Sequence, residues 1–365
     1  MKALILGDVC PTVTTDPLFK AKDKEALFGN TLPLFEGNDI FFINLECALT
    51  EGGRPIKKYG PNLRGCPETA EVLADIGVTH CGLSNNHVLD FSSEGIADTK
   101  KALEGAGITY TGFGDNYGDS RKNLVIEKDG ETVTFITVCE HEYTYALENR
   151  MGSRPFDEYD TMEDIREARK TSDRVIVIYH GGKEHCRYPS PRLRKLCHAM
   201  IRNGADLVVG QHSHCISCYE QYEGGLILYG QGNFHFIKPV LANPSLVKTW
   251  NNSLAVKYDT KENRMEFIPL VVSGSGIALA KGQEKDEIMD SFYQRNRELI
   301  LGAWKAGWHD FCESMKGHYL NVIKEACMEG ATEEQYKMFG HFLDCEAHTD
   351  VWRELFPSAN LTNEK

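Results

Sequence analysis

The sequence predicts an α/β protein in which β-strands and helices alternate along most of the chain. Short apolar runs rich in β-branched residues recur between residues 2 and 209, amphipathic stretches separate several of them, and polar residues follow where each run ends. Strands that are joined through helices pair in parallel and are covered by those helices. We therefore expect a mainly parallel sheet with helices packed against it.

The elements can be placed in order along the chain. Apolar runs typical of buried strands occur at residues 2–6, 39–45, 80–83, 133–138, 174–179 and 206–209. Amphipathic helices are predicted at residues 66–76, 93–106, 161–171 and 191–203. Hairpins are indicated at residues 123–138 and 259–267 by charged turn sequences. Runs at residues 225–229, 253–258 and 265–272 have no long helix between them, which favours a second sheet packed on the first.

The composition changes to helix-forming residues beyond Gly274. Helices are predicted at residues 284–301, 304–329 and 332–344 and in a last segment that ends at residue 356. Apolar residues spaced along one helix face, such as Ile288 and Phe292, indicate core packing. We divide the chain into an α/β domain at residues 1–272 and a helical C-terminal extension at residues 273–365, which could be a lid or a dimer surface.

Charge and composition exclude several classes of partner. The chain has 40 Lys and Arg against 53 Asp and Glu, a net charge of −13, which repels nucleic acid and anionic membranes. No apolar run approaches the roughly 20 residues of a membrane span. Most of the 12 cysteines lie singly in apolar segments, as buried free thiols do. We expect a cytoplasmic protein without a nucleic-acid partner or a membrane span, and leave a homo-oligomer open.

Polar side chains follow each predicted strand. Because the carboxyl ends of parallel strands meet at one edge of a sheet, these side chains are expected to gather there. A set of carboxylate, amide and imidazole groups suits Mn, Fe or Zn and differs from a thiolate-rich structural zinc site. The groups are Asp8, Asn44 with Glu46, Ser84 to His87, Glu140 to Glu142, His180, and Gln211 to His214.

The motifs at these strand ends resemble a known family. They read GDV at residues 7–9, NLE at 44–46, SNNHVLD at 84–90, HGGKEH at 180–185, GADLVVGQHSH at 204–214 and LYGQGNF at 228–234. Together they resemble the CapA/PgsA capsule and poly-γ-glutamate biosynthesis family, a relative of the calcineurin-like metallophosphoesterases, over residues 1–272. The resemblance implies a four-layer α/β/β/α sandwich of metallophosphoesterase type that holds two divalent metal ions.

The resemblance also assigns roles to residues. It implies His87 and Glu184 as catalytic residues, of which His87 would stabilise or protonate the leaving oxygen. We further expect Lys183 and Arg187 to clamp an anionic group of the substrate. The implied metal ligands are Asp8, Glu46 as the bridging carboxylate, Asn86, His180, His212 and His214, and further expected substrate contacts are Asn85, Glu140 and Glu142.

One departure from the phosphoesterase pattern concerns the first motif. That pattern opens Asp-x-His, whereas residue 10 of this chain is cysteine, so one ion lacks a ligand unless Cys10, water or Glu140 replaces it. The sequence predicts a metal-dependent hydrolase that acts on a phosphoester or a γ-glutamyl amide of an anionic small molecule or polymer. The alternative is a non-catalytic binding or assembly subunit of a polyglutamate or capsule synthesis system.

Overall fold

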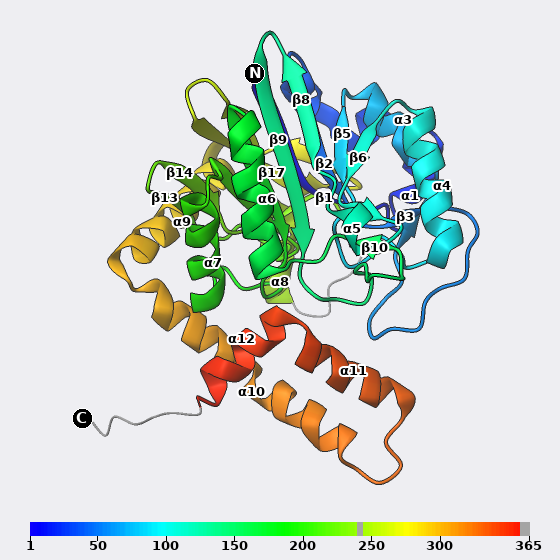
Figure 1. The fold of residues 1–365 in the computed structure, drawn as a ribbon, viewed down its shortest axis with the longest axis vertical. Coiled ribbons are helices and arrows are strands. Elements are labelled where there is room, and N and C mark those ends of the chain that lie inside the picture. The colour runs from blue at the N-terminus through cyan, green and yellow to red at the C-terminus, as the bar shows by residue number, and fades with distance from the viewer. Residues whose placement is uncertain (239–243, 358–365) are drawn as a thin grey trace.

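Two β-sheets face each other between two layers of helices in the computed structural model, which describes residues 1–238 and 244–357 (Figure 1). One apolar cluster lies between the sheets and includes Phe42 and Phe135. A second cluster lies between the first sheet and its helices, and a third between the second sheet and its helices. The predicted four-layer α/β/β/α sandwich is therefore confirmed.

The first sheet has the strand order β18-β17-β16-β1-β2-β5-β6, with β15 paired to β1 near its end. The strands β1, β2, β5 and β6 are parallel to one another. Strands β16, β17 and β18 extend the sheet beyond β1, and each pairs antiparallel with its neighbour. The bounds are β1 Lys2–Val9, β2 Ile40–Leu45, β5 His80–Gly82, β6 Thr109–Thr111, β15 Asn233–His235, β16 Asn252–Asp259, β17 Arg264–Ser273 and β18 Gly276–Leu279.

The second sheet has the strand order β13-β14-β12-β11-β9-β8. Its central strands β9, β11, β12 and β14 are parallel, and β8 and β13 form its antiparallel edges. The bounds are β8 Leu124–Lys128, β9 Glu131–Cys139, β11 Arg174–His180, β12 Leu207–Gln211, β13 Tyr219–Tyr222 and β14 Gly225–Leu228. Two small sheets pair β3 Ala48–Leu49 with β4 Arg64–Gly65 and β7 Phe113–Gly114 with β10 Gly152–Ser153.

The helices cover the outer faces of the sandwich. On the side of the first sheet lie α3 Glu68–Asp75 and α4 Ser92–Gly105, and on the side of the second lie α6 Glu158–Thr171 and α7 Pro191–Arg202 (Figure 1). The shorter elements are α1 Asp16–Lys20, α2 Lys24–Phe28, the 3-10 helix Gly29–Phe35, α5 Tyr117–Ser120 and α8 Pro244–Asn251.

The prediction that residues 225–229, 253–258 and 265–272 form the second sheet together was wrong. Strand β14 joins the second sheet beside β12, but β16 and β17 extend the first sheet. The physical reason is the free edge of β1, which β16 covers in antiparallel register from Lys2 opposite Asp259 to Ile5 opposite Val256. Pairing satisfies the backbone groups that an open edge would leave exposed.

The C-terminal helices are packed into the sandwich at two places. They are α9 Gly282–Leu301, α10 Trp304–Ala326, α11 Glu333–Asp344 and α12 Glu346–Leu355. Ile288 and Phe292 of α9 join the core between the sheets, and Trp304, Trp308 and Val351 join the core around α7. Figure 1 shows α11 and α12 at the end toward which β9 points. The helices therefore meet the edge where the strand ends gather.

The cysteines and the helix lengths bear on two further predictions. All 12 cysteines are free, and each of them except Cys327 is buried. Within residues 1–238 and 244–357, we find no helix with both the length and the apolar character needed to cross a membrane.

The contact between His141 and Glu346 attaches α12 to the loop after β9, and it predicts a pH-dependent stability. The two atoms His141 Nδ1 and Glu346 Oε1 lie 2.5 Å apart, and the hydrogen bond to Glu346 raises the pKa of His141 above 6.5. The stabilisation is therefore complete below about pH 6.5 and is lost as the pH rises through the raised pKa. We expect the melting temperature of the wild type to fall more between pH 6 and pH 9 than that of His141→Gln, as thermal unfolding at both pH values would measure. Equal falls would contradict the role of this pair.

Candidate metal centre

Two buried carboxylates lie at the carboxyl ends of neighbouring strands of the first sheet. Asp8 pairs in register with Asn44, and Glu46 follows β2 and donates its backbone N–H to Val9. Both acidic side chains are inaccessible to solvent. Asp8 Oδ1 accepts a hydrogen bond of 2.7 Å from Asn44 Nδ2. The parallel pairing of β1 and β2 thus fixes both carboxylates at one edge.

Three histidines reach the same place from the second sheet. His180 ends β11, and His212 and His214 follow β12. The backbone of His212 has φ 78° and that of His214 has φ 52°, a left-handed conformation that is costly for residues other than glycine. Such strain persists where the surrounding structure determines it, and it gathers at functional sites.

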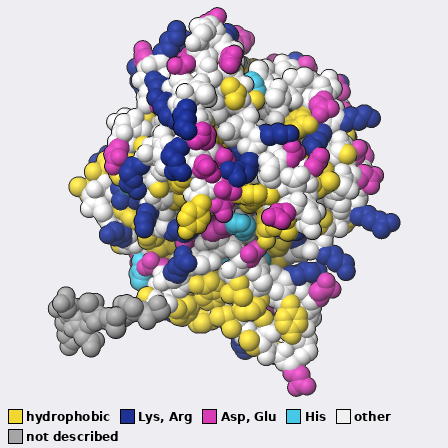
Figure 2. Space-filling view, in the orientation of Figure 1, with side chains coloured by type: hydrophobic (Ala, Val, Ile, Leu, Met, Phe, Trp, Pro, Cys, Tyr) yellow, Lys and Arg dark blue, Asp and Glu magenta, His cyan; other side chains and the backbone are white. Residues whose placement is uncertain are grey.

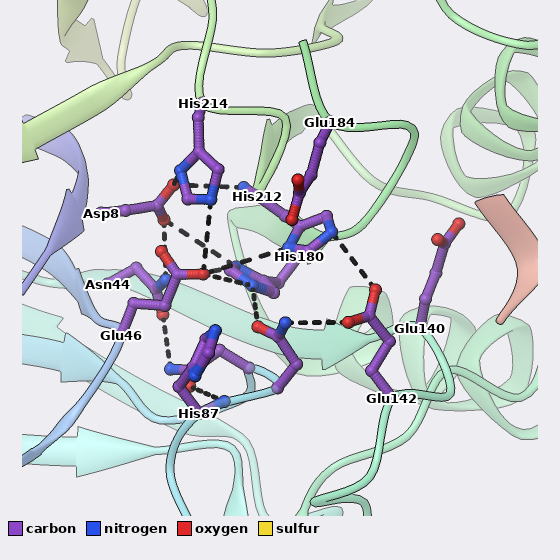
Figure 3. A network of polar contacts seen from close by, with 12 residues as sticks. Asp8, Asn44, Glu46, His87, Glu140, Glu142, His180, Glu184, His212 and His214 are labelled. Carbon is purple, nitrogen blue, oxygen red and sulfur yellow. Dashed lines mark hydrogen bonds and ion pairs between the residues drawn. The ribbon is translucent and has the colours of Figure 1, made fainter. Parts of the chain in front are cut away.

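The imidazoles surround one oxygen of Glu46 (Figure 3). Glu46 Oε1 lies 3.4 Å from His180 Nε2, 4.0 Å from His212 Nδ1 and 3.9 Å from His214 Nε2. Neither carboxylate oxygen of Glu46 has a hydrogen bond within the described residues. Burial and the neighbouring Asp8 raise the pKa of Glu46 to about 8.

A divalent cation fits this arrangement. Buried polar atoms without a partner are rare in proteins and call for an explanation, and a bound ion supplies one. Ligand atoms of Glu46, His212 and His214 lie within 4.8 Å of one another. The carboxylate and imidazole donors match first-row ions such as Mn, Fe and Zn.

Amide side chains orient these groups. Asn233 Oδ1 lies 2.8 Å from His214 Nδ1, which leaves Nε2 of that ring directed toward Glu46. Asn44 Nδ2 lies 3.2 Å from His180 Nδ1, and Asn85 Nδ2 donates to Asn44 Oδ1 over 3.1 Å. Asn85 is fully buried and holds the end of β2. The acceptor Asn233 Oδ1 therefore fixes the tautomer and the orientation of the His214 ring, as such contacts do for metal-binding histidines.

Asn86 and Glu142 extend the cluster on the other side of His180. Asn86 Oδ1 lies 3.1 Å from His180 Nε2, while its Nδ2 donates to Glu142 Oε2 over 2.8 Å. Glu142 Oε1 lies 3.3 Å from His212 Nε2. Burial opposes ionisation of Glu142, but His212 holds its pKa well below 4.5, and Glu142 in turn raises the pKa of His212 to about 10.

His87 belongs to a second polar group beside the cluster. Its Nδ1 lies 2.6 Å from Asp90 Oδ2 and 3.0 Å from Lys58 Nζ. Lys58 and Asp90 form a buried ion pair of 2.5 Å. Burial and Lys58 lower the pKa of His87 to about 4, so the ring is neutral at neutral pH. Its Nε2 has no hydrogen bond within the described residues.

Two of the expected substrate contacts lie outside the cluster. Glu140 accepts hydrogen bonds from Tyr179 over 2.7 Å, Arg192 over 2.6 Å and the backbone of Gly182, and its carboxylate lies apart from those of Asp8 and Glu46 (Figure 3). Arg187 donates to Ser291 of α9 over 2.7 Å and lines a different pocket.

Lys183 and Glu184 line a cavity of about 500 Å³ that opens beside His212 and Glu142. Glu184 is 44% exposed and lies 3.9 Å from His185 Nε2. The surrounding cavity wall opposes ionisation, but Lys183 and the nearby histidines lower the pKa of Glu184 below its usual value. The opposite wall belongs to the C-terminal helices.

Several side chains of the site were not singled out from the sequence. Asp90 closes the motif that contains His87, so its position three residues later was a usable signal. Lys58 comes from the loop between β3 and β4, and His341 and His348 come from the C-terminal helices. No pattern within these segments marks them as neighbours of the strand ends.

Comparison with known proteins agrees with the motifs. The family described as "Bacterial capsule synthesis protein PGA_cap" matches residues 2–238. "PGA biosynthesis protein CapA" of Bacillus subtilis (strain 168) is 28% identical over 321 residues, which cover 84% of this chain and 80% of that protein. "Capsule biosynthesis protein CapA" of Bacillus anthracis is 26% identical over 335 residues, which cover 88% of this chain and 79% of that protein.

Comparison with solved structures gives matches of lower sequence identity. A hypothetical protein from Thermus thermophilus has a TM-score of 0.42 and 16% identity, covering 76% of this chain and 96% of that one. The 5'-nucleotidase from Candida albicans has a TM-score of 0.41 and 9% identity, covering 87% of this chain and 58% of that one. The family match spans the whole cluster from Asp8 to His214, and this chain therefore belongs to the bacterial capsule synthesis protein family PGA_cap.

Proposed function

We propose that this protein is a metal-dependent hydrolase that cleaves a phosphoester or a γ-glutamyl amide in capsule or poly-γ-glutamate metabolism. The observation that carries the proposal is the buried carboxylate of Glu46, which has no hydrogen bond within the described residues and is surrounded by three imidazoles. Membership of the capsule synthesis family supports the metabolic setting.

The proposed ligands divide into two sets that share Glu46. Asp8, Glu46 and His214 would hold one ion, and the second would be held by Glu46, Asn86, His180 and His212. A bound divalent ion of this type lowers the pKa of water and polarises a phosphoryl or carbonyl oxygen. Cys10 adds little to the first set, because burial raises the pKa of its thiol well above 9 and the sulfur already contacts the carbonyl of Pro11.

The proposed role of His87 is to protonate the leaving oxygen or nitrogen from Nε2 once the ring has taken up a proton, while Asp90 accepts from Nδ1 and fixes the ring. We expect His87→Gln to lower kcat by about 10²-fold with unchanged metal content, since this ring is not among the proposed ligands. Steady-state kinetics together with elemental analysis would measure both. His80→Gln is the matched control, because His80 of β5 bonds the hydroxyl of Thr79 and should retain full activity. Loss of metal in His87→Gln would assign this residue to the metal centre.

The proposal is tested on the purified protein by elemental analysis and by hydrolysis assays. The substrates are a panel of phosphomonoesters and phosphodiesters and a γ-linked glutamyl peptide, each with and without a chelator. We expect bound first-row metal and a turnover that the chelator abolishes. Full metal occupancy without turnover of any substrate would instead favour a binding or assembly subunit.

A further inference from the structure

The cavity beside the metal centre has two walls that come from distant parts of the chain. One wall contains Glu142, Lys183, Glu184 and His212, and the other contains residues of α10, α11 and α12. Figure 2 shows histidine side chains at the junction between the sandwich and the helices below it. We propose, on the basis of the hydrolase function above, that α10–α12 complete the substrate site and that Lys183, His341 and His348 bind an oxyanion of the substrate.

The first support is Lys183. Its ammonium group has no ion pair or hydrogen bond within residues 1–238 and 244–357, although the side chain is half-buried in the cavity wall. Lys183 acts on the neighbouring Glu184 only through space, since no ion pair joins the two side chains, so its ammonium group is available to a ligand in the cavity. An anionic group of a ligand would supply the missing partner.

The second support is His348, which is 6% exposed. Its Nδ1 lies 2.6 Å from the hydroxyl of Tyr319, a residue inaccessible to solvent. This is the only hydrogen bond of that hydroxyl within the described residues, and an unused buried donor is costly, so the hydroxyl donates to Nδ1. The neutral ring then carries its proton on Nε2, which has no partner in the described chain. His348 therefore offers an N–H donor in the cavity wall.

The third support is His341 at the end of α11. Its ring stacks on Tyr143 at 4.9 Å between centroids and contacts the ring of His348 at 4.7 Å. Neither ring nitrogen has a hydrogen bond within the part of the chain that the structure describes. The aromatic contacts hold the ring in place and leave both nitrogens for a ligand.

The position of these helices relative to the metal centre is fixed by direct contacts. Cys345 lies between the two histidines in sequence, and its thiol lies 3.4 Å from Glu142 Oε1. The backbone N–H of His141 donates to Glu346 Oε2 over 2.8 Å. Both contacts join the turn between α11 and α12 to the loop after β9. The imidazoles are thus held beside the groups that surround Glu46.

The rest of the cavity indicates what carries the oxyanion. Phe311, Met315 and Phe342 add an apolar surface to the cavity wall. An aliphatic spacer fits such a surface, with its carboxylate or phosphate directed to Lys183 and the histidines. A γ-linked glutamyl chain and an alkyl phosphate both have this chemistry.

The test measures binding by calorimetry to the full chain loaded with Mn²⁺, with γ-linked triglutamate and butyl phosphate as separate probes. We expect one probe to bind, and Lys183→Gln, His341→Gln and His348→Gln each to weaken that binding by about tenfold with unchanged metal content. His309→Gln is the matched control, because His309 on α10 pairs with Glu354 and is 52% exposed. The probe that binds identifies the oxyanion.

Three outcomes would overturn the inference. Equal binding of the probe by all variants would exclude the oxyanion site. Wild-type protein that holds metal but binds neither probe would exclude it as well. Neither outcome would contradict the proposed metal centre. Weakening by His309→Gln to the same extent would show a general effect. If the wild type holds no metal, the hydrolase proposal fails. The same titrations on metal-free protein then show whether Lys183, His341 and His348 bind an oxyanion. Lys183→Gln keeps the test valid if a histidine variant does not fold.

Discussion

His212→Ala is expected to lose bound metal and to reduce hydrolysis by about 10³-fold, equivalent to about 4 kcal/mol of transition-state stabilisation. Nδ1 of His212 lies 4.0 Å from Glu46 Oε1, and Nε2 of the same ring lies 3.3 Å from Glu142 Oε1. Its removal takes one imidazole from the proposed ligands and leaves the charge of Glu142 uncompensated. Elemental analysis and turnover of the best substrate in the panel would measure both losses.

The matched control for this variant is His198→Ala. His198 also bonds a carboxylate, Glu220, over 2.7 Å, but it lies on α7 and stacks on Tyr222, outside the cluster. We expect this control to keep its metal and its activity. If His212→Ala keeps both as well, then His212 is not a ligand and the division of the proposed ligands into two sets is incorrect.

The gathering of the candidate metal ligands at one edge could be predicted from the sequence because of a topological rule. Asp8, Glu46, His180 and His212 are far apart along the chain, but each comes shortly after an apolar run that predicts a strand. Parallel strands end at one edge, so the rule gathers these residues without knowledge of the strand order. The left-handed backbone conformation of His212 and His214 then determines how their rings are oriented toward Glu46.

The cavity wall could not be predicted in this way. His341 and His348 lie on helices whose apolar residues predict packing but not the partner that they pack against. Glu140 and Glu142 show the same limit on a smaller scale. They are two residues apart, and the loop after β9 turns Glu142 to His212 and Glu140 to Arg192. A sequence pattern describes an element, whereas these contacts depend on how elements dock.

The division of strands between the sheets has a similar cause. Apolar runs identified β16 and β17 closely. The predicted ranges were 253–258 and 265–272, and the strands span Asn252–Asp259 and Arg264–Ser273. Their membership of the first sheet depends on the free edge of β1, which no local pattern describes. The local sequence thus determines where a strand forms, whereas its partner depends on contacts with strands that are distant in the sequence.

Phe42→Ala is expected to destabilise the fold by about 3–5 kcal/mol, the usual cost of removing a fully buried aromatic ring. Phe42 of β2 stacks on Phe135 of β9 with centroids 4.9 Å apart and an interplanar angle of 10°, and neither residue is accessible to solvent. These rings form one contact between the two sheets, since Phe42 belongs to the cluster between them, whereas Phe41 and Ile43 on either side face the helices. Urea unfolding monitored by circular dichroism would measure the change.

Val125→Ala gives the comparison, because Val125 on β8 is 55% exposed and its removal should change the unfolding free energy by less than about 0.5 kcal/mol. A similar small change in Phe42→Ala would mean that the two sheets are not held by this contact.

Phe42→Ala also tests how the core between the sheets supports the candidate metal centre. Glu46 comes from the first sheet and His180 from the second, so a cavity between the sheets alters the distance between these two groups. We therefore expect Phe42→Ala to weaken metal binding, and Val125→Ala to leave it unchanged.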